Sequence, residues 1–143
     1  MFSKTCEYAI RAMLFIAQKT KEGDRIGIKD IAKGIDSPEH FIAKILQDLS
    51  RKGLLQSAKG PTGGFYLNDV SMKQSLADIV KAVDGDKIFQ GCGLGLKQCS
   101  EALPCPIHHE FKRVRKQLFQ MLERAKVGTF TSTLENSMAF LKR

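Results

Sequence analysis

Apolar residues recur at helical spacing along most of the chain, and this pattern predicts a mainly α-helical protein. Serines suited to N-capping stand at Ser3, Ser37 and Ser75, where three of the helices are expected to begin. Asp78 completes a capping box with Ser75. The predicted helices span residues 3–19, 28–35, 38–52, 75–83, 107–126 and 131–141.

A short β-hairpin is expected after the third helix. Its strands are residues 54–58 and 64–68, and the glycines and proline of residues 59–63 fit only a turn between them. Two short helices joined by a tight turn and followed by a hairpin form the outline of a winged helix-turn-helix. The alternative is that the same elements serve only as scaffold.

The helix over residues 38–52 is the predicted recognition helix. Phe41, Ile45 and Leu49 form its apolar stripe, and its N-terminal half should enter the major groove of DNA. The positive end of the helix dipole suits a phosphate, the wing glycines permit close approach, and basic residues neutralise the backbone. The candidate DNA-binding residues are Lys4, Ser37, Pro38, Glu39, His40, Ala43, Lys44, Arg51, Lys52, Lys59, Gly60, Gly63 and Gly64.

The helix over residues 107–126 is the longest and carries a heptad seam. Its apolar positions step by four and three residues, which is typical of a helix that packs along a partner helix. Packing on the first helix of the same chain is the alternative. The seam consists of Ile107, Phe111, Val114, Leu118, Met121 and Ala125.

Charge and composition narrow the class of protein. The 143 residues carry a net charge of +8 and no long apolar run, which favours a nucleic-acid partner and excludes a membrane span. Residues 1–68 carry a net +4, residues 69–106 a net −1 and residues 107–143 a net +5. The net charge of +5 in residues 107–143 is interpreted as the solvated face of the long helix. No nucleophile–base pair, phosphate loop or nucleotide fingerprint indicates an enzyme, and the absence of a signal peptide predicts a cytoplasmic protein.

Three cysteines and a histidine follow the pattern C-x6-C-x5-C-x2-H in a glycine- and proline-rich loop. These residues are Cys92, Cys99, Cys105 and His108. Reduced thiols at this spacing suggest a metal, and the wide gaps favour an iron–sulfur cluster over the tight knuckles of zinc sites. Zinc, a disulfide switch and three unrelated thiols are the alternatives. Cys6 is expected to be a small buried apolar side chain.

The helix motif at residues 8–13, the wing motif at residues 60–65 and the cysteine trio together resemble the IscR/NsrR family of winged-helix regulators. The resemblance covers essentially the whole chain. It implies a homodimer that binds a palindromic operator and carries an iron–sulfur cluster, [2Fe-2S] or [4Fe-4S], on Cys92, Cys99 and Cys105. His108 matches the fourth ligand of IscR-like members, whereas Glu7 from the partner subunit matches that of NsrR-like members.

We therefore predict a mainly α fold with a small β-hairpin: a winged helix-turn-helix domain plus a long dimerisation helix. Residues 1–84 form the DNA-binding region, residues 85–106 the sensor loop, and residues 107–143 the dimerisation and C-terminal helices. The predicted function is a sequence-specific transcriptional regulator whose DNA affinity is set by the cluster, in response to redox state, nitric oxide or iron supply. The alternative is a cluster-free regulator that uses Cys99 and Cys105 as a disulfide pair.

Overall fold

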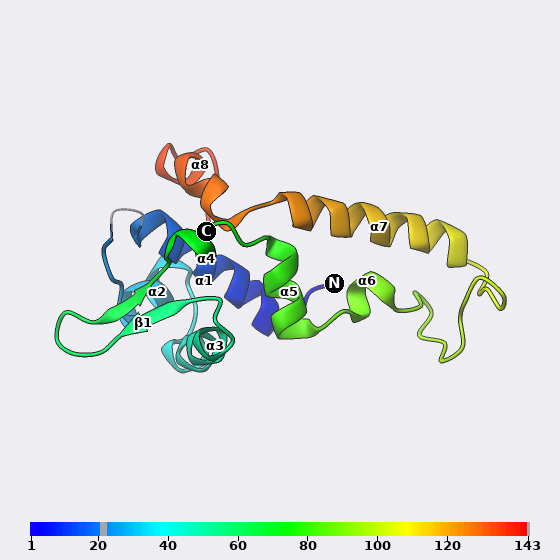
Figure 1. Cartoon of the computed structure of the whole chain (residues 1–143), viewed down its shortest axis with the longest axis horizontal. Helices are drawn as coiled ribbons and strands as arrows, with labels where there is room; N and C mark the ends of the chain where they lie inside the picture. Colours follow the sequence, from blue (N-terminus) through cyan, green and yellow to red (C-terminus); the bar gives the residue numbers. More distant parts are fainter. Residues whose placement is uncertain (21–22, 143) are drawn as a thin grey trace.

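The computed structural model describes residues 1–20 and 23–142, and it is mainly helical with one two-stranded antiparallel sheet (Figure 1). The fold class predicted from the sequence is confirmed. The elements are α1 (Lys4–Thr20), α2 (Ile28–Gly34), α3 (Glu39–Arg51), β1 (Gln56–Ala58), β2 (Gly64–Tyr66), α4 (Asp69–Met72), α5 (Leu76–Asp84), α6 (Lys87–Gln90), α7 (His108–Arg124), the 3₁₀ turn η1 (Val127–Phe130) and α8 (Thr131–Glu135).

Helix α1 is the centre of the hydrophobic core. Its inner face, which includes Cys6, Met13 and Ile16, is fully buried, and it packs against α3, α5 and η1. The hydroxyl of Ser3 accepts a hydrogen bond from the backbone of Cys6 at 3.0 Å, which caps the helix as predicted. The backbone N–H of Ser3 also donates to Asp84 at 2.9 Å, so the start of α1 is fastened to the end of α5.

The turn between α2 and α3 differs from the prediction at its cap. Asp36 has a φ of 54°, and the N–H of Ser37 bonds to the carbonyl of Ala32 at 2.9 Å, which is the Schellman closure of α2. Ser37 is therefore committed to the end of α2, and the N-cap of α3 is Pro38 without a side-chain cap. The prediction that Ser37 caps α3 is wrong. The hydroxyl of Ser37 is buried and has no hydrogen-bond partner among the described residues.

The wing is shorter than predicted. Ser57 pairs with Phe65 at the middle of the β1–β2 ladder, and a bridge from Ile26 to Phe65 extends the ladder on the other side. The N–H of Gly63 bonds to the carbonyl of Gly60 at 2.9 Å and closes the turn at the wing tip. The second strand stops early because Asn68 caps α4, a helix that the sequence analysis did not predict.

The second half of the chain forms an arm that projects from this body. Helix α5 begins with the predicted capping box of Ser75 and Asp78. Helix α7 runs outward beside α6, and the segment 91–107 closes the far end of the arm (Figure 1). Helix α6 lies inside the region that was predicted to be only a loop, and its single turn is too short to show a hydrophobic period.

The C-terminal helix α8 ends earlier than the predicted residue 141. Ser137 has a φ of 54°, and the N–H of Met138 bonds to the carbonyl of Thr133 at 2.9 Å. This Schellman motif terminates the helix after Glu135. No helix in the described part of the chain is both long and apolar enough to cross a membrane.

Candidate metal centre and nucleic-acid interface

Three cysteine thiols converge at the far end of the arm. The sulfur atoms of Cys92, Cys99 and Cys105 all lie within 4.8 Å of one another, and those of Cys92 and Cys105 are 3.7 Å apart. The loop brings them together although 13 residues separate the first from the last. The clustering that the sequence spacing suggested is thus present in the structure.

His108 lies beside the trio, at the first position of α7. Its Nδ1 atom is 3.1 Å from the sulfur of Cys99, and its backbone N–H donates to the carbonyl of Cys105 at 3.0 Å. The side chain is 8% exposed, so the ring orientation is fixed by packing. His108 thus touches the trio through Cys99, and its ring also belongs to a neighbouring group of close donors with Glu101 and His109.

Glu101 stands behind His108, and the sequence analysis did not single it out. One of its carboxylate oxygens is 3.4 Å from His108 Nε2, and the same carboxylate accepts a hydrogen bond from Lys112. The Lys112 hydrogen bond, followed by that from His108, lowers the pKa of Glu101. A carboxylate that holds the outer nitrogen of a histidine orients the other nitrogen, as in many metal sites. Its place between Cys99 and His108 was the only sequence signal for it.

The thiols differ in acidity. Backbone N–H groups of Leu96 and Leu94 donate to Cys92 and lower the pKa of its thiol to about 7. Desolvation raises the pKa of Cys105. Cys92 is thus the thiol of this pair that loses its proton at lower pH.

The remaining cysteine and the alternative ligand lie in α1, away from the trio. Cys6 is fully buried, as predicted, and burial raises its pKa to about 12. Glu7 forms an ion pair with Lys4 at 3.2 Å and belongs to neither group of metal-ligating side chains that a single described chain brings together. As a ligand, Glu7 would have to come from a second subunit.

The N-terminal half of α3 presents a polar, exposed face. Glu39, His40 and Lys44 are exposed, and Ala43 is half-buried beside the start of α2. Phe41 is 51% exposed, so its expected place in the apolar stripe is wrong. Ile45 and Leu49, the other members of that stripe, are buried as predicted, together with Ile42 and Leu46.

Several other predicted contact residues have partners within the chain. Lys52 pairs with Asp48 at 3.0 Å and donates to the carbonyl of Ala82, whereas Arg51 is exposed. Lys59 and Gly60 project at the wing tip, while Gly63 at the end of the turn and Gly64 at the start of β2 are half-buried. The hydroxyl of Ser37 would have to turn outward to reach a phosphate.

One cation beside the wing was missed. The guanidinium of Arg25 lies 5.4 Å from the centre of the Tyr66 ring, and its side chain is exposed. Arg25 precedes Ile26, whose bridge to Phe65 fixes it next to β2. Nothing in the sequence indicates that a charged residue in this turn will lie beside the wing.

Half of the seam of α7 is exposed in one chain. Ile107 is 39% exposed, Val114 56% and Met121 46%. Leu118 and Ala125 of the seam are half-buried against the core, to which the neighbouring Leu122 belongs. An apolar row of this kind on a projecting helix is typical of a surface that a second protein covers.

A two-helix unit with an exposed second helix, followed by a two-stranded wing, defines a winged-helix protein. Residues 2–133 match the Rrf2 family, described as iron-dependent transcriptional regulators, and the chain therefore belongs to that family. It is a transcriptional regulator and not an enzyme, and the resemblance to IscR/NsrR-type members is confirmed.

Relatives agree with this assignment, and solved structures share the fold. An HTH-type transcriptional regulator of Aquifex aeolicus is 33% identical over 121 residues, which cover 82% of each chain. The regulator NsrR of Oceanobacillus iheyensis is 20% identical over 96% of this chain and 94% of its own. The structure of CymR, the global cysteine regulator of B. subtilis, matches with a TM-score of 0.76 at 23% identity over 92% of this chain and 96% of its own. The structure of T. potens IscR matches with a TM-score of 0.73 at 22% identity over 97% of this chain and 92% of its own.

Proposed function

We propose that this regulator is a homodimer whose affinity for DNA changes when an iron–sulfur cluster binds Cys92, Cys99, Cys105 and His108. The proposal is carried by one observation. Three sulfur atoms lie within 4.8 Å of one another, and the imidazole of His108 is 3.1 Å from one of them.

The donor set fits such a cluster. Thiolates hold iron–sulfur clusters, and an imidazole can replace one of them. The iron-dependent character of the family supports iron over zinc. When bound, the cluster would supply a group that oxidants, nitric oxide or iron scarcity can alter.

The positions of the ligands suggest how the site communicates with the rest of the dimer. His108 opens α7, and Cys105 bonds to it through the backbone, so ligation would fix the start of the helix that carries the exposed seam. A partner α7 on this seam would place two winged helices side by side, which suits a palindromic operator. A ligand shifts such an arrangement only by its different affinity for the two states.

A cluster-free thiol switch is the second candidate function. The sulfur atoms of Cys92 and Cys105 are 3.7 Å apart, so a small movement would allow a disulfide. The sequence suggested Cys99 and Cys105 as the disulfide pair, and their sulfur atoms also lie within 4.8 Å of one another. The fold likeness to CymR is compatible with either candidate.

The test is to purify the protein anaerobically and record its visible spectrum. Absorption at about 320–420 nm is expected from thiolate-held iron, and it should be lost in Cys99→Ala but kept in Cys6→Ala, which removes the cysteine outside the trio. A duplex selected by the protein from a random library is then titrated with loaded and metal-free protein. We expect the two affinities to differ by at least about tenfold.

Two results would contradict the proposal. The first is that the protein stays colourless after anaerobic reconstitution with iron and sulfide, while formation of a Cys92–Cys105 disulfide changes its DNA affinity. This result would favour the thiol switch. The other is equal DNA affinity in all states. His108→Ala and Glu7→Ala separate the two fourth-ligand assignments, because only the true ligand's loss should speed cluster release.

A further inference from the structure

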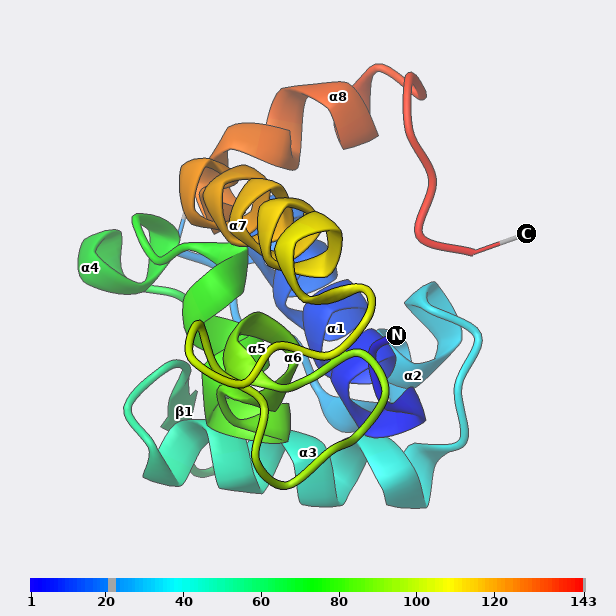
Figure 2. The same ribbon diagram turned by 90° about the vertical axis from the view of Figure 1, so that its right-hand side faces the viewer.

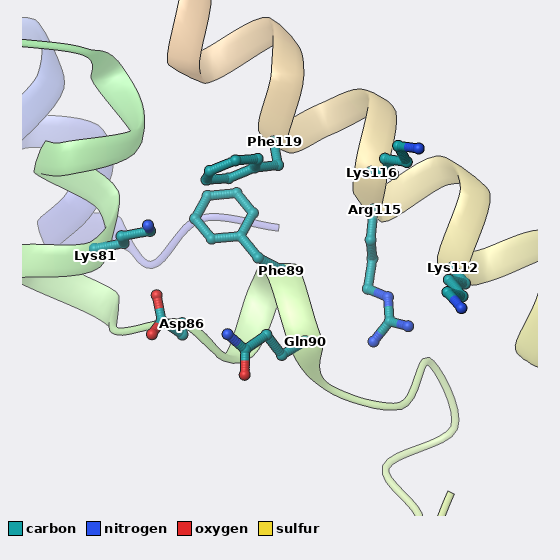
Figure 3. Close-up of a pocket in the computed structure, with 8 residues that line it drawn as sticks. All are labelled: Lys81, Asp86, Phe89, Gln90, Lys112, Arg115, Lys116 and Phe119. Atoms are coloured by element: carbon teal, nitrogen blue, oxygen red, sulfur yellow. The ribbon is translucent and has the colours of Figure 1, made fainter. Parts of the chain in front are cut away.

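A cavity of about 390 Å³ lies between α5, α6 and α7 (Figure 3). Its volume is in the range of small-molecule sites. By helical spacing, Lys112, Lys116 and Phe119 lie on a different face of α7 from Val114 and the rest of the seam. Arg115 borders both this cavity and the one beside the seam, so dimerisation through the seam would leave open the side of the cavity formed by Lys112, Lys116 and Phe119.

One wall of the cavity is apolar and aromatic. The rings of Phe89 and Phe119 meet edge to face with their centres 5.1 Å apart, one from α6 and one from α7. The ammonium of Lys81 lies 4.9 Å from the centre of the Phe119 ring. This wall offers a surface for the apolar body of a ligand.

The rest of the lining is strongly basic. Four cations line the cavity against the single carboxylate of Asp86. Lys112 is paired with Glu101, whereas Lys81, Lys116 and Arg115 form no ion pair with any described residue. A cavity with this excess of positive charge attracts an anion.

Among these cations, Arg115 has the side chain that is most firmly held in place. It extends from α7 along the lining of the cavity (Figure 3). Its guanidinium lies 5.4 Å from the centre of the Phe111 ring and donates one hydrogen bond to the carbonyl of Gly91. Its Nε atom is buried and has no partner among the described residues. A guanidinium presents its donors in a geometry that matches a carboxylate or phosphate, so Arg115 is the cation best suited to an anionic group here.

DNA is a poor match for this cavity. The recognition helix α3 runs along the opposite edge of the molecule from α7, with α5 and α6 between them (Figure 2). A ligand here need not compete with an operator on α3 and the wing. An aromatic wall next to the fixed cation Arg115 suits a small molecule with a ring and an anionic group better than it suits the backbone of a DNA duplex.

We propose that this cavity binds a small organic anion, with its carboxylate or phosphate group on Arg115 and Lys116 and its apolar body on Phe89 and Phe119. The site goes beyond the metal centre, because none of its lining residues is a candidate cluster ligand. Arg115 joins the two regions through Gly91, the residue that precedes Cys92. The ligand would thus sit beside the peptide that leads into the cysteine loop.

The test is to titrate the full-length protein with phenyl phosphate and with benzoate, and to follow binding by calorimetry and by amide chemical shifts. Inorganic phosphate and phenol, which carry the anionic group and the ring separately, are the matched probes. Lys116→Gln and Arg115→Gln remove cavity cations, while Arg113→Gln removes the same charge from the outer face of α7, where it pairs with Glu110.

We expect saturable binding of at least one aromatic anion, at least about fivefold tighter than either part alone. Both cavity variants should weaken it by at least about fivefold, and Arg113→Gln should not. Whichever of phenyl phosphate and benzoate binds more tightly shows whether the cavity prefers a phosphate or a carboxylate. Absence of saturable binding, equal weakening by Arg113→Gln, or equal affinity for inorganic phosphate would each overturn the proposal. Because binding needs neither cluster nor DNA, failure here leaves the proposed function untouched.

Discussion

Arg115 donates a hydrogen bond to the carbonyl oxygen of Gly91 and so fastens α7 to the residue just before Cys92. This bond spans 24 residues and joins the two ends of the cysteine segment. Gly93, two residues further on, lies so close to α7 that an added Cβ would be 2.9 Å from the Phe111 ring. The first part of the loop is therefore held on the helix before any metal binds.

We predict that Arg115→Gln loosens this attachment. A charge-assisted hydrogen bond contributes about 1.5–3 kcal/mol, so amides near Gly91 should exchange with solvent about tenfold faster or more. Hydrogen–deuterium exchange followed by mass spectrometry measures this effect, with Arg113→Gln as the matched control. Unchanged exchange near Gly91 would show that the bond does not hold the loop.

The sequence was sufficient for features that are local. The capping box of Ser75 and Asp78 is encoded within four residues, and the trio's spacing was enough to expect a shared ligand. Ser37 was misassigned because the competing Schellman closure of α2 uses the same residue, and the sequence alone cannot rank the two.

The missed residues depend on tertiary packing. Glu101 acquires its role only when the loop folds back onto His108, and Arg25 only when Ile26 pairs with Phe65. Basic residues of α7 were interpreted as a solvated face, because the cavity they line is formed by α5 and α6 from an earlier part of the chain.

We predict that the thiols of the reduced, metal-free protein react in a fixed order with pH. The thiolate is the reactive form, so alkylation of Cys92 should rise with pH and reach half its maximum near its pKa of about 7. Cys105, whose pKa is raised, should require more alkaline solution, and Cys6, with a pKa of about 12, should react only on unfolding. Iodoacetamide labelling from acid to alkaline pH, analysed by peptide mass spectrometry, measures this. Identical profiles for Cys92 and Cys105 would disprove the role of the Leu96 and Leu94 N–H groups.

We predict that Gly64→Ala destabilises the wing more than Gly60→Ala does. Both glycines have positive φ, 143° and 98°, but an added Cβ at Gly64 would lie 2.8 Å from the carbonyl oxygen of Ile26, whereas at Gly60 it meets nothing within 4 Å. Gly60→Ala should cost about 1 kcal/mol of unfolding free energy from backbone strain alone, and Gly64→Ala about 2–4 kcal/mol. Urea denaturation of the two variants provides the comparison. Equal losses would mean that the Ile26 backbone moves aside without cost.

We predict that Val114→Glu converts the protein from a dimer to a monomer. Val114 is 56% exposed in the seam of α7, and a glutamate there would have to be buried without a partner when two such helices pack together. Gln120→Glu is the matched control, because it places the same charge on a different, exposed face of the helix. Sedimentation velocity measures the mass of both variants, and circular dichroism shows whether they keep their helices. A folded Val114→Glu protein that remains dimeric would place the dimer interface elsewhere, and the proposed coupling from His108 through α7 to the partner subunit would then lose its route.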